Sequence, residues 1–261
     1  MSDLHGSCMA CKMYEYSLIG SSQCLACADG KSSFTSSASC EVPLSTSSIR
    51  QAVNSAEEGG IVIWKSGTGV LEQTWSDPWG WEITMAFTWL CTGVAEKCVI
   101  DAMASASSQR TVLIVYIPAT ILTFSNFVGL AIRGGHREPN SGGRGGGIGV
   151  RWGAKVNIID CEISNNHAPY GAGIYIGTDV VIVSSIHGTK FADNTAGNTL
   201  GVDIFGMSGD IDVRGCTFSF TTTTNVYTDS ATITFQGSEC DSGRSTRLSE
   251  ARNGRLLVAT E

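Results

Sequence analysis

Gly145-Gly146-Gly147-Ile148-Gly149-Val150, followed by Cys161-Glu162-Ile163-Ser164-Asn165-Asn166, is the stretch that decides the fold, because the chain repeats it. The second copy reads Gly171-Ala172-Gly173-Ile174-Tyr175-Ile176 and then Thr189-Lys190-Phe191-Ala192-Asp193-Asn194. A third copy gives Gly201-Val202-Asp203-Ile204-Phe205 and then Cys216-Thr217-Phe218-Ser219. Cys161, Thr189 and Cys216 therefore mark a repeat with a period of roughly 27 or 28 residues, a length typical of solenoids.

Within each period the apolar residues form short β-branched runs that glycine and asparagine interrupt. Such runs are too short for helices and indicate strands joined by turns. One turn of chain cannot bury its apolar face alone, so successive turns must stack about 4.8 Å apart in a parallel β-solenoid. Asparagine at a corner tolerates left-handed backbone and bonds to neighbouring main chain. The repeat predicts these stacked residues: Ile158 with Ile186, Ile163 with Phe191 and Phe218, and Asn166 with Asn194.

The repeated phrases resemble the paired GGxIY and CxFxxN phrases of polymorphic-outer-membrane-protein-type right-handed β-helices, which are widespread in secreted and surface proteins. Gly171 to Tyr175 carries the first phrase, and Cys161 to Asn166 carries the second. The resemblance covers residues 60 to 220 and implies an all-β fold, a right-handed parallel β-helix, which we expect over residues 61–240. It implies little about function, because pectin lyase-like enzymes, hydrolases, epimerases and plain adhesins share this fold.

Composition suits an exported all-β chain. The 261 residues include 31 glycines, 5 prolines and 10 cysteines, and the net charge is −7. This charge leaves no basic stripe to neutralise phosphates, so we expect no nucleic-acid partner. The cysteine content indicates an oxidising compartment, either extracellular or at the cell surface. No signal peptide is visible after Met1, and we interpret the sequence as a fragment of a longer one.

Residues 1–42 form a separate cysteine-rich segment. Its cysteines follow a second repeat, at Cys8, Cys11, Cys24, Cys27 and Cys40. The two Cys-x-x-Cys pairs have a spacing that one tetrahedral zinc ion could use. The fifth cysteine and the small polar loops instead resemble the ephrin-receptor-like cysteine-rich repeat of extracellular proteins. That resemblance implies disulfides, such as Cys11 with Cys24 and Cys27 with Cys40, and we favour it over zinc.

The segments that flank the solenoid have their own patterns. Residues 43–60 are expected to form a linker and a capping helix that starts at Ser48 and ends at Gly59-Gly60. Such a helix covers the unpaired strand edges at the open end of a solenoid. Beyond Cys240, residues 241–261 lack periodicity and are expected to be an irregular tail.

The first coils precede the clear repeat. Strand-like runs are predicted at Ile61–Trp64, Trp81–Trp89, Cys98–Asp101, Val112–Val115, Ile121–Phe124 and Val128–Ile132, with turns at Gly67-Thr68-Gly69 and Ser76-Asp77-Pro78. The uncharged segment Thr111 to Ile132 is long enough to cross a bilayer, but Pro118 interrupts it and we expect strands and no membrane span. Cys91 and Cys98 are expected to bridge a turn. Five tryptophans are expected in the core beneath the cap rather than on a sugar-stacking platform: Trp64, Trp75, Trp79, Trp81 and Trp89.

A basic, glycine-rich loop is the one positive cluster in the sequence. Its members are Arg133, His136, Arg137, Arg144 and Arg151. These residues are candidates for binding an acidic polysaccharide, because guanidinium groups bind carboxylates through charge-assisted hydrogen bonds. A solvated loop between coils is the simpler interpretation, and we favour it at this stage.

No catalytic or metal site is predicted. Asp210 and Asp212 are the best local pair of carboxyl groups, since alternate residues of a strand point the same way and glycoside hydrolysis needs two carboxyl groups roughly 5–10 Å apart. Solvated aspartates are common, so this pair is a weak candidate. We expect His136, His167 and His187 in turns, without a spacing that would gather them on a metal. The glycines before Val150 precede strands rather than a helix, so no phosphate or nucleotide cofactor is predicted.

Cys161 and Cys216 occupy equivalent positions two coils apart, a separation of roughly 9 to 10 Å. This distance is too long for a disulfide. We expect both to be buried thiols, with a Cys216–Cys240 disulfide as the alternative.

The sequence thus predicts an extracellular or cell-surface β-helix that recognises a polysaccharide or a surface protein without catalysis. The alternative is a carbohydrate-active enzyme, a polysaccharide lyase, epimerase or hydrolase, that acts on acidic cell-wall polysaccharide. The two hypotheses differ in whether acids and bases converge. An enzyme would bring Asp179, Asp203, Asp210 and Asp212 near Arg133 or Arg151 in one groove.

Overall fold

The computed structural model describes most of the predicted solenoid and short parts of the flanking segments. The described residues are 15–16, 25–26, 58–64, 67–70, 80–91, 98–117, 124–139, 143–177, 183–219, 224–236, 239–240, 249–251 and 255–258. The expected disulfides of Cys11, Cys24, Cys27 and Cys40, the body of the expected capping helix, Trp75, Trp79 and Asp179 lie outside these residues.

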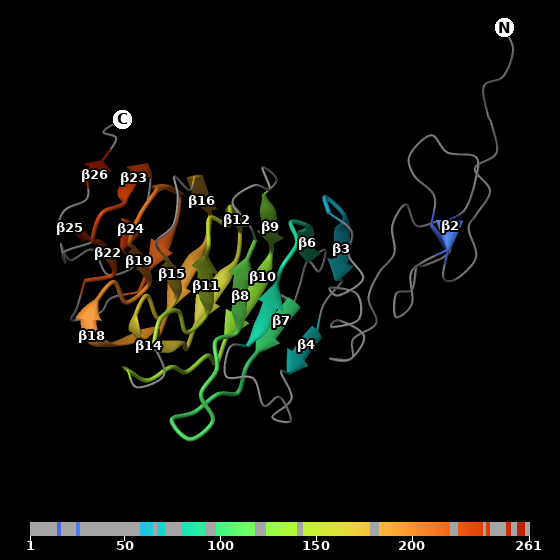
Figure 1. Ribbon diagram of the computed structural model, residues 1–261, viewed down its shortest axis with the longest axis horizontal. Coiled ribbons are helices and arrows are strands. Elements are labelled where there is room, and N and C mark those ends of the chain that lie inside the picture. Colours follow the sequence, from blue (N-terminus) through green and yellow to red (C-terminus); the bar gives the residue numbers. More distant parts are fainter. Residues whose placement is uncertain are drawn as a thin grey trace, which may run out of the picture.

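Within the described residues, three long sheets wrap one core, and every neighbouring pair of strands in them is parallel. Figure 1 shows their strands side by side along a rod, from β3 and β4 at one end to β26 at the other. Each pass of the chain adds one strand to each sheet. The predicted parallel β-solenoid is therefore confirmed, because its neighbouring strands come from successive passes rather than from hairpins.

The three sheets are named here by their order along a coil. Sheet 1 contains β3 (Ile61–Trp64), β6 (Thr88–Cys91), β9 (Ser125–Val128), β12 (Val156–Ile159), β16 (Val183–His187), β20 (Asp210–Arg214), β23 (Thr232–Gln236) and β26 (Arg255–Val258). Sheet 2 contains β4 (Gly67–Val70), β7 (Cys98–Asp101), β10 (Leu130–Arg133), β13 (Glu162–Ser164), β17 (Lys190–Ala192), β21 (Thr217–Phe218) and β24 (Glu239–Cys240). Sheet 3 contains β5 (Trp81–Ile83), β8 (Leu113–Tyr116), β11 (Ile148–Arg151), β15 (Ile174–Ile176), β19 (Ile204–Gly206), β22 (Val226–Thr228) and β25 (Ser249–Ala251).

A narrow strip lies between sheets 2 and 3 in the chain path. It contains the parallel pair β14 (His167–Tyr170) and β18 (Thr195–Leu200). The preceding coil joins it through single bridges, His136 to His167 and Arg144 to Tyr170. In the cysteine-rich segment, β1 (Glu15–Tyr16) pairs with β2 (Leu25–Ala26) in the antiparallel sense.

The register of the core follows the repeat. Ile158 lies opposite Ile186, and Ile163 lies opposite Phe191, which in turn lies opposite Phe218. The rings of Phe191 and Phe218 stack with centroids 5.0 Å apart, and all five side chains are buried. These predicted pairs are confirmed.

The predicted asparagine stack is also confirmed. Asn166 and Asn194 are buried, and the Nδ2 atom of Asn166 donates to Asn194 Oδ1 at 3.2 Å. Each side chain bonds to the main chain of a neighbouring coil, as when Asn194 Nδ2 donates to the Ile163 carbonyl at 2.9 Å. One detail differs: the left-handed backbone falls one residue earlier, at Asn165 (φ 54°) and Asp193 (φ 53°). Asn165 and Asp193 make the turn, so Asn166 and Asn194 avoid the strained left-handed backbone and their side-chain amides point inward.

The repeated glycine phrase forms the corner that leads into sheet 3. Gly145 and Gly201 have positive φ, as does Gly171 between them. A Cβ atom would lie 2.8 Å from the Ile148 carbonyl oxygen at Gly145, and 2.6 Å from that of Ile204 at Gly201. Only glycine fits this corner, since both the backbone angle and the space exclude a side chain.

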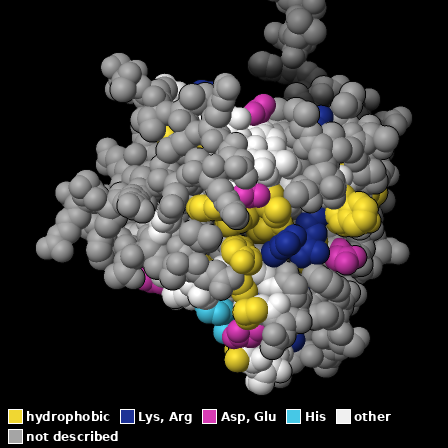
Figure 2. All heavy atoms as spheres, turned by 60° about the vertical axis from the view of Figure 1, so that its left-hand side comes forward, with side chains coloured by type: hydrophobic (Ala, Val, Ile, Leu, Met, Phe, Trp, Pro, Cys, Tyr) yellow, Lys and Arg dark blue, Asp and Glu magenta, His cyan; other side chains and the backbone are white. Residues whose placement is uncertain are grey.

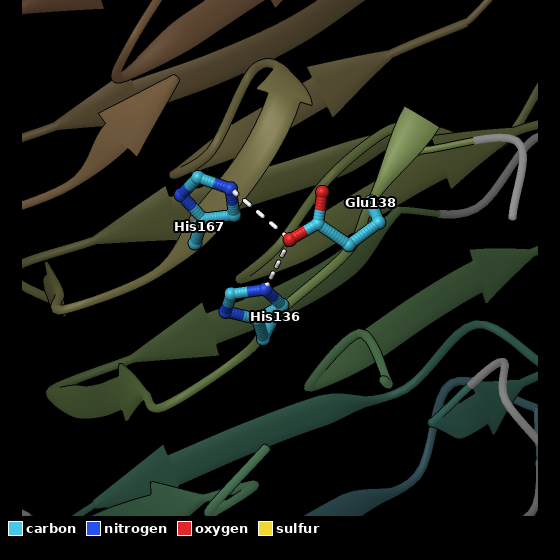
Figure 3. Close-up of side chains that lie close together, drawn as sticks. All are labelled: His136, Glu138 and His167. Carbon is cyan, nitrogen blue, oxygen red and sulfur yellow. Dashed lines mark hydrogen bonds and ion pairs between the residues drawn. The ribbon is translucent and has the colours of Figure 1, made fainter. Parts of the chain in front are cut away.

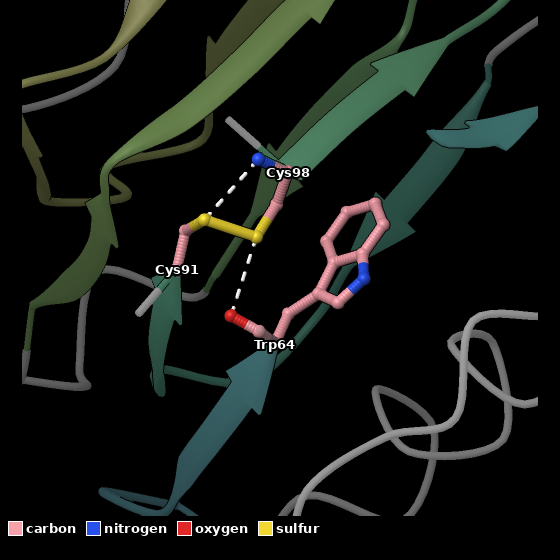
Figure 4. The surroundings of a disulfide bond; sticks show 3 residues. All are labelled: Trp64, Cys91 and Cys98. Carbon is pink, nitrogen blue, oxygen red and sulfur yellow. Dashed lines mark hydrogen bonds between the residues drawn. A yellow bond between two sulfur atoms is a disulfide. The ribbon is translucent and has the colours of Figure 1, made fainter. Parts of the chain in front are cut away.

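The first described coils are filled by tryptophan and closed by a disulfide. Trp64, Trp81 and Trp89 are buried, which confirms that they fill the core. Cys91 and Cys98 form the expected disulfide, and Cys98 Sγ lies 3.2 Å from the Trp64 carbonyl oxygen (Figure 4). A loop-closing bridge restricts the unfolded chain and so stabilises the start of the stack.

The remaining cysteines of the core are buried thiols. Cys161 and Cys216 both carry a thiol, and Cys216 Sγ donates to the Ile186 carbonyl at 3.3 Å. Burial raises the pKa of the Cys216 thiol to about 11. The alternative Cys216–Cys240 disulfide is wrong, because the register places Cys240 opposite Phe218 rather than beside Cys216.

Three other expectations need correction. Gly67-Thr68-Gly69 belongs to β4, because it pairs with β7 instead of turning. The run Trp81–Trp89 is divided between β5 in sheet 3 and β6 in sheet 1, since one coil passes from one sheet to the other there. The segment 241–261 is not irregular throughout, because β25 pairs with β22 and β26 pairs with β23. The strand Arg255–Val258 therefore covers an edge of β23 that would otherwise be unpaired.

The described parts of the uncharged segment Thr111 to Ile132 form solenoid strands. β8, β9 and β10 come from Thr111 to Arg133. Among the residues that the structure describes, no helix has the length and apolar character needed to cross a membrane.

Asp203 is a carboxyl group inside this fold. It is only 2% exposed and accepts hydrogen bonds from the side-chain amides of Asn194 and Asn225. Burial raises its pKa from 3.8 to about 6, although the two amides oppose the shift. Asp203 therefore continues the row of buried, hydrogen-bonded polar side chains, and its ionisation is disfavoured because the charge is removed from water.

Truncation of the phenylalanine stack is the first prediction. Phe191→Ala removes a buried ring and leaves a cavity between two coils, so the free energy of unfolding should fall by about 3–5 kcal/mol. Urea unfolding followed by circular dichroism measures the change. Lys190→Ala, in the same strand but exposed, is the matched control and should change stability by less than about 0.5 kcal/mol. Equal effects of the two substitutions would contradict the packing described here.

The second prediction concerns pH. The pKa of Asp203 is higher in the folded state than in the unfolded state. Protonation of Asp203 therefore adds to the free energy of unfolding, fully below pH 3.8, and this stabilisation is lost as the pH rises to about 6. The unfolding free energy of Asp203→Asn minus that of the native chain should therefore increase by on the order of 3 kcal/mol between pH 4 and 7. Asp193→Asn, an exposed carboxylate in the same coil, controls for loss of one charge. A difference that stays flat or falls with pH would refute the buried-carboxyl account.

Candidate functional site

The five candidates of the basic loop do not form one cluster. Arg133 lies on β10 in sheet 2, where its Nε donates to Asp101 Oδ2 at 2.8 Å. Arg137 is completely buried and cannot reach an external ligand. His136 joins a different group of side chains, described below. Arg144 and Arg151 remain, and they lie on one face.

Arg144 and Arg151 meet beside the outer surface of sheet 3. The guanidinium carbon of Arg144 lies 5.4 Å from the ring centroid of Tyr175, a cation–π geometry. Burial lowers the pKa of Arg151, and the positive charge of nearby Arg144 lowers it further, while Tyr175 raises it. Both guanidinium groups therefore lie near Tyr175, where an anion could interact with two positive charges.

An exposed aromatic pair lies directly beside Arg151. Arg151 pairs with Tyr116 in the parallel ladder of β11 and β8, and Trp152 follows Arg151 in the chain. The rings of Tyr116 and Trp152 have centroids 5.2 Å apart. Tyr116 is 40% exposed and Trp152 is 54% exposed, among the largest exposures of apolar side chains in the described chain. We call Tyr116, Arg144, Arg151 and Trp152 the aromatic–arginine patch.

The backbone at Trp152 is strained. Trp152 and Gly153 have φ values of 58° and 81°, and the Ala154 amide donates to the Arg151 carbonyl at 3.1 Å. Positive φ at both central residues is the geometry of a type I′ turn, which favours Asn-Gly. A bulky residue in left-handed backbone costs roughly 1–2 kcal/mol. The turn therefore presents an indole to solvent at a position where the fold itself would prefer a different residue.

A buried aromatic stack supports the patch. Tyr175, Phe205 and Tyr227 project from successive strands of sheet 3, with ring centroids 5.8 Å and 5.1 Å apart. Figure 2 shows one face of the molecule on which Lys or Arg side chains lie among hydrophobic ones, with histidine beside an acidic group further along. Rigid aromatic surfaces next to guanidinium groups suit sugar rings that carry carboxylates.

A second group of side chains lies in the strip between sheets 2 and 3. His136 Nε2 is 2.9 Å from Glu138 Oε1, and His167 Nε2 is 4.0 Å from the same oxygen. The two imidazole rings stack with centroids 4.4 Å apart (Figure 3). Burial lowers the pKa of His167, as does neighbouring His136, whereas Glu138 raises it. The expectation that the histidines lie in turns with no spacing that gathers them is wrong for this pair, because His167 lies in β14 and adjacent coils place it beside His136.

The candidate acids do not converge with the arginines of the patch. Asp210 and Asp212 point outward from β20 in sheet 1, as predicted, and the alternate residues Ile211 and Val213 are buried. Both oxygens of Asp212 bond to Arg214, at 2.9 and 2.7 Å, and His187 Nε2 lies 3.9 Å away. Asp203 is buried. Asp210 and Asp212 therefore lie on a different sheet from the patch, and Asp203 lies in the interior.

Four residues of these two groups were not predicted from the sequence as site residues: Tyr116, Glu138, Trp152 and His167. The exposure of Trp152 could have been predicted, because it directly precedes Gly153 at the end of a predicted strand, and turns at such positions are open to solvent. The pairing of His136 with His167 could not have been predicted. The coil that separates them is longer than the clear repeat, so the repeat does not give the register between them.

Comparison with protein-family models, curated proteins and solved structures found no match for this chain. The sites are therefore assessed by their geometry and chemistry.

The strained turn gives a third prediction. Trp152→Gly should be more stable than Trp152→Ala by about 1 kcal/mol, because only glycine adopts left-handed backbone without strain. Thermal and urea unfolding of the two variants measure the difference. The same pair of substitutions at Lys190, which lies in the extended strand β17, should show the opposite order. A Trp152→Ala variant as stable as Trp152→Gly would contradict the assigned backbone.

Proposed function

We propose that this solenoid is an extracellular or cell-surface recognition module that binds acidic polysaccharide, without catalysis, at the aromatic–arginine patch. The observation that carries the proposal is the juxtaposition of Arg144 and Arg151 with the exposed, strained Trp152. Guanidinium groups recognise uronate carboxylates through paired hydrogen bonds, and indole rings stack on the apolar faces of sugars. A rigid stack holds these groups in place before binding, which reduces the entropy lost on association.

The disulfide supports the proposed location. Cys91–Cys98 stabilises the start of the stack, and such bridges persist in oxidising compartments. The thiols of Cys161 and Cys216 are buried, which protects them from oxidation in such a compartment.

The distribution of acids disfavours the enzymatic alternative. A polysaccharide lyase, epimerase or hydrolase would need acids and a cation that face one substrate. Among the described candidate acids, Asp212 is the one that lies close to both an arginine and a histidine, Arg214 and His187. There, Arg214 occupies both carboxylate oxygens of Asp212, and the patch arginines belong to other parts of the coil.

The fourth prediction tests the patch. Purified, oxidised protein should bind a polyuronate such as polygalacturonate in co-sedimentation and calorimetry, and the affinity should fall as salt is added. Arg151→Gln should weaken binding about tenfold or more, since a hydrogen bond to a charged group contributes about 1.5–3 kcal/mol. Trp152→Gly should weaken binding without loss of stability, which separates a binding role from a structural one.

Arg214→Gln is the matched control, because it removes an exposed arginine from sheet 1. The affinity of Arg214→Gln for polygalacturonate should equal that of the native chain. If Arg151→Gln and Trp152→Gly also bind normally, the patch is not the binding site. The same incubations are followed for unsaturated or reducing products. Products that disappear in Asp212→Asn would instead support the enzymatic alternative.

A further inference from the structure

His136, Glu138 and His167 are brought together by the stacking of two coils. The His136 amide donates to the Arg110 carbonyl at 2.9 Å, and the His167 amide donates to the Gly135 carbonyl at 2.7 Å. The Arg137 amide, between His136 and Glu138, donates to the His167 carbonyl at 2.9 Å. The Glu138 amide donates to Gln109 Oε1 at 3.1 Å. Each of the three residues therefore has a main-chain hydrogen bond that holds it in place, and a small movement of side chains is enough to change their spacing.

The side-chain geometry matches the requirements of a metal ion. One ligand atom from each residue lies within 4.8 Å of the other two. Tetrahedral zinc with bonds of about 2.0–2.2 Å holds its ligand atoms about 3.4 Å apart. The distances from Glu138 Oε1 to the two Nε2 atoms, 2.9 and 4.0 Å, bracket this value. Figure 3 shows both imidazoles directed at the carboxylate of Glu138.

A further hydrogen bond orients one of the ligands. His167 Nδ1 lies 2.9 Å from Thr195 Oγ1, on the next coil. When Nδ1 carries the proton and donates it to Thr195, the lone pair of His167 is on Nε2, which faces Glu138. Histidines that bind metals ordinarily have such a partner on the other ring nitrogen.

The three side chains are also accessible from solvent. The exposed fractions are 22% for His136, 30% for His167 and 34% for Glu138. An ion can therefore enter, and it would keep at least one coordination position for water or for an external ligand.

We propose that His136, Glu138 and His167 form a binding site for a divalent transition-metal ion, with zinc as the best fit. Two imidazoles and one carboxylate favour borderline ions such as Zn²⁺, whereas Ca²⁺ and Mg²⁺ prefer sites made only of oxygen ligands. The site goes beyond the proposed recognition function and does not rest on it, since it uses none of the residues of the aromatic–arginine patch.

The fifth prediction is a titration of the full, oxidised chain with Zn²⁺ against a chromogenic chelator. The native protein should bind one equivalent at this site. His167→Ala and Glu138→Gln should each lower the affinity at least about tenfold, because loss of even a hydrogen-bonded partner of a metal ligand costs about 10–100-fold. Thr195→Val should give a smaller loss. His187→Ala removes a histidine of sheet 1 and is the matched control, with unchanged affinity.

Cobalt(II) distinguishes this site from the cysteines of residues 1–42. A cobalt complex with nitrogen and oxygen ligands lacks the thiolate-to-metal charge-transfer band that cysteine ligands produce. Circular dichroism without metal checks that each variant is folded. The proposal is overturned if the native chain binds no Zn²⁺, if His167→Ala and Glu138→Gln retain native affinity, or if the cobalt complex shows the thiolate band.

Discussion

Hydrogen bonding between the main chains of successive coils is the interaction on which the rest of this structure depends. Each strand of the three sheets obtains its partner from the preceding and following pass of the chain. No coil can satisfy its own strand edges or cover its own apolar face, so the coils are stable only as a stack. The ends of the stack are consequently its weak points. Tryptophans and a disulfide reinforce the first coils, and β25 and β26 extend the sheets at the other end.

The same stacking creates the two candidate sites. Arg151 and Tyr116 come from adjacent strands of sheet 3, and His136 and His167 come from adjacent coils of the strip. Because the coils are held in register, these side chains lie side by side although they are distant in sequence. The geometry is thus rigid in the part of the molecule that binding would use, which is the property expected of a preorganised surface.

Polar groups inside the stack show how strongly the register is specified. Asn166 and Asn194 each bond to the main chain of a neighbouring coil, and Asp203 accepts from two amides. A slip of one residue would leave these buried groups without hydrogen bonds, at a cost of about 1–3 kcal/mol for each group. The asparagines therefore favour one register over others that would bury similar apolar area. Asp203 adds a pH dependence to that arrangement, because its ionised form is desolvated.

The sequence by itself determined the solenoid, its inner residues and the stacked pairs Ile158–Ile186, Phe191–Phe218 and Asn166–Asn194, because a fixed repeat puts equivalent residues one above another. It also predicted the Cys91–Cys98 disulfide and the burial of Cys161 and Cys216. It could not determine the end of the stack, since Arg255–Val258 has no counterpart in the clear repeat and joins only by covering the edge of β23. The sequence also did not predict which residues come together in the two candidate sites. Only the tertiary structure separated Arg133 and Arg137 from Arg144 and Arg151, exposed Trp152, and placed Glu138 between two histidines. The physical reason is that coils of unequal length shift the corners, so contacts there depend on backbone turns and side-chain directions that periodicity does not encode.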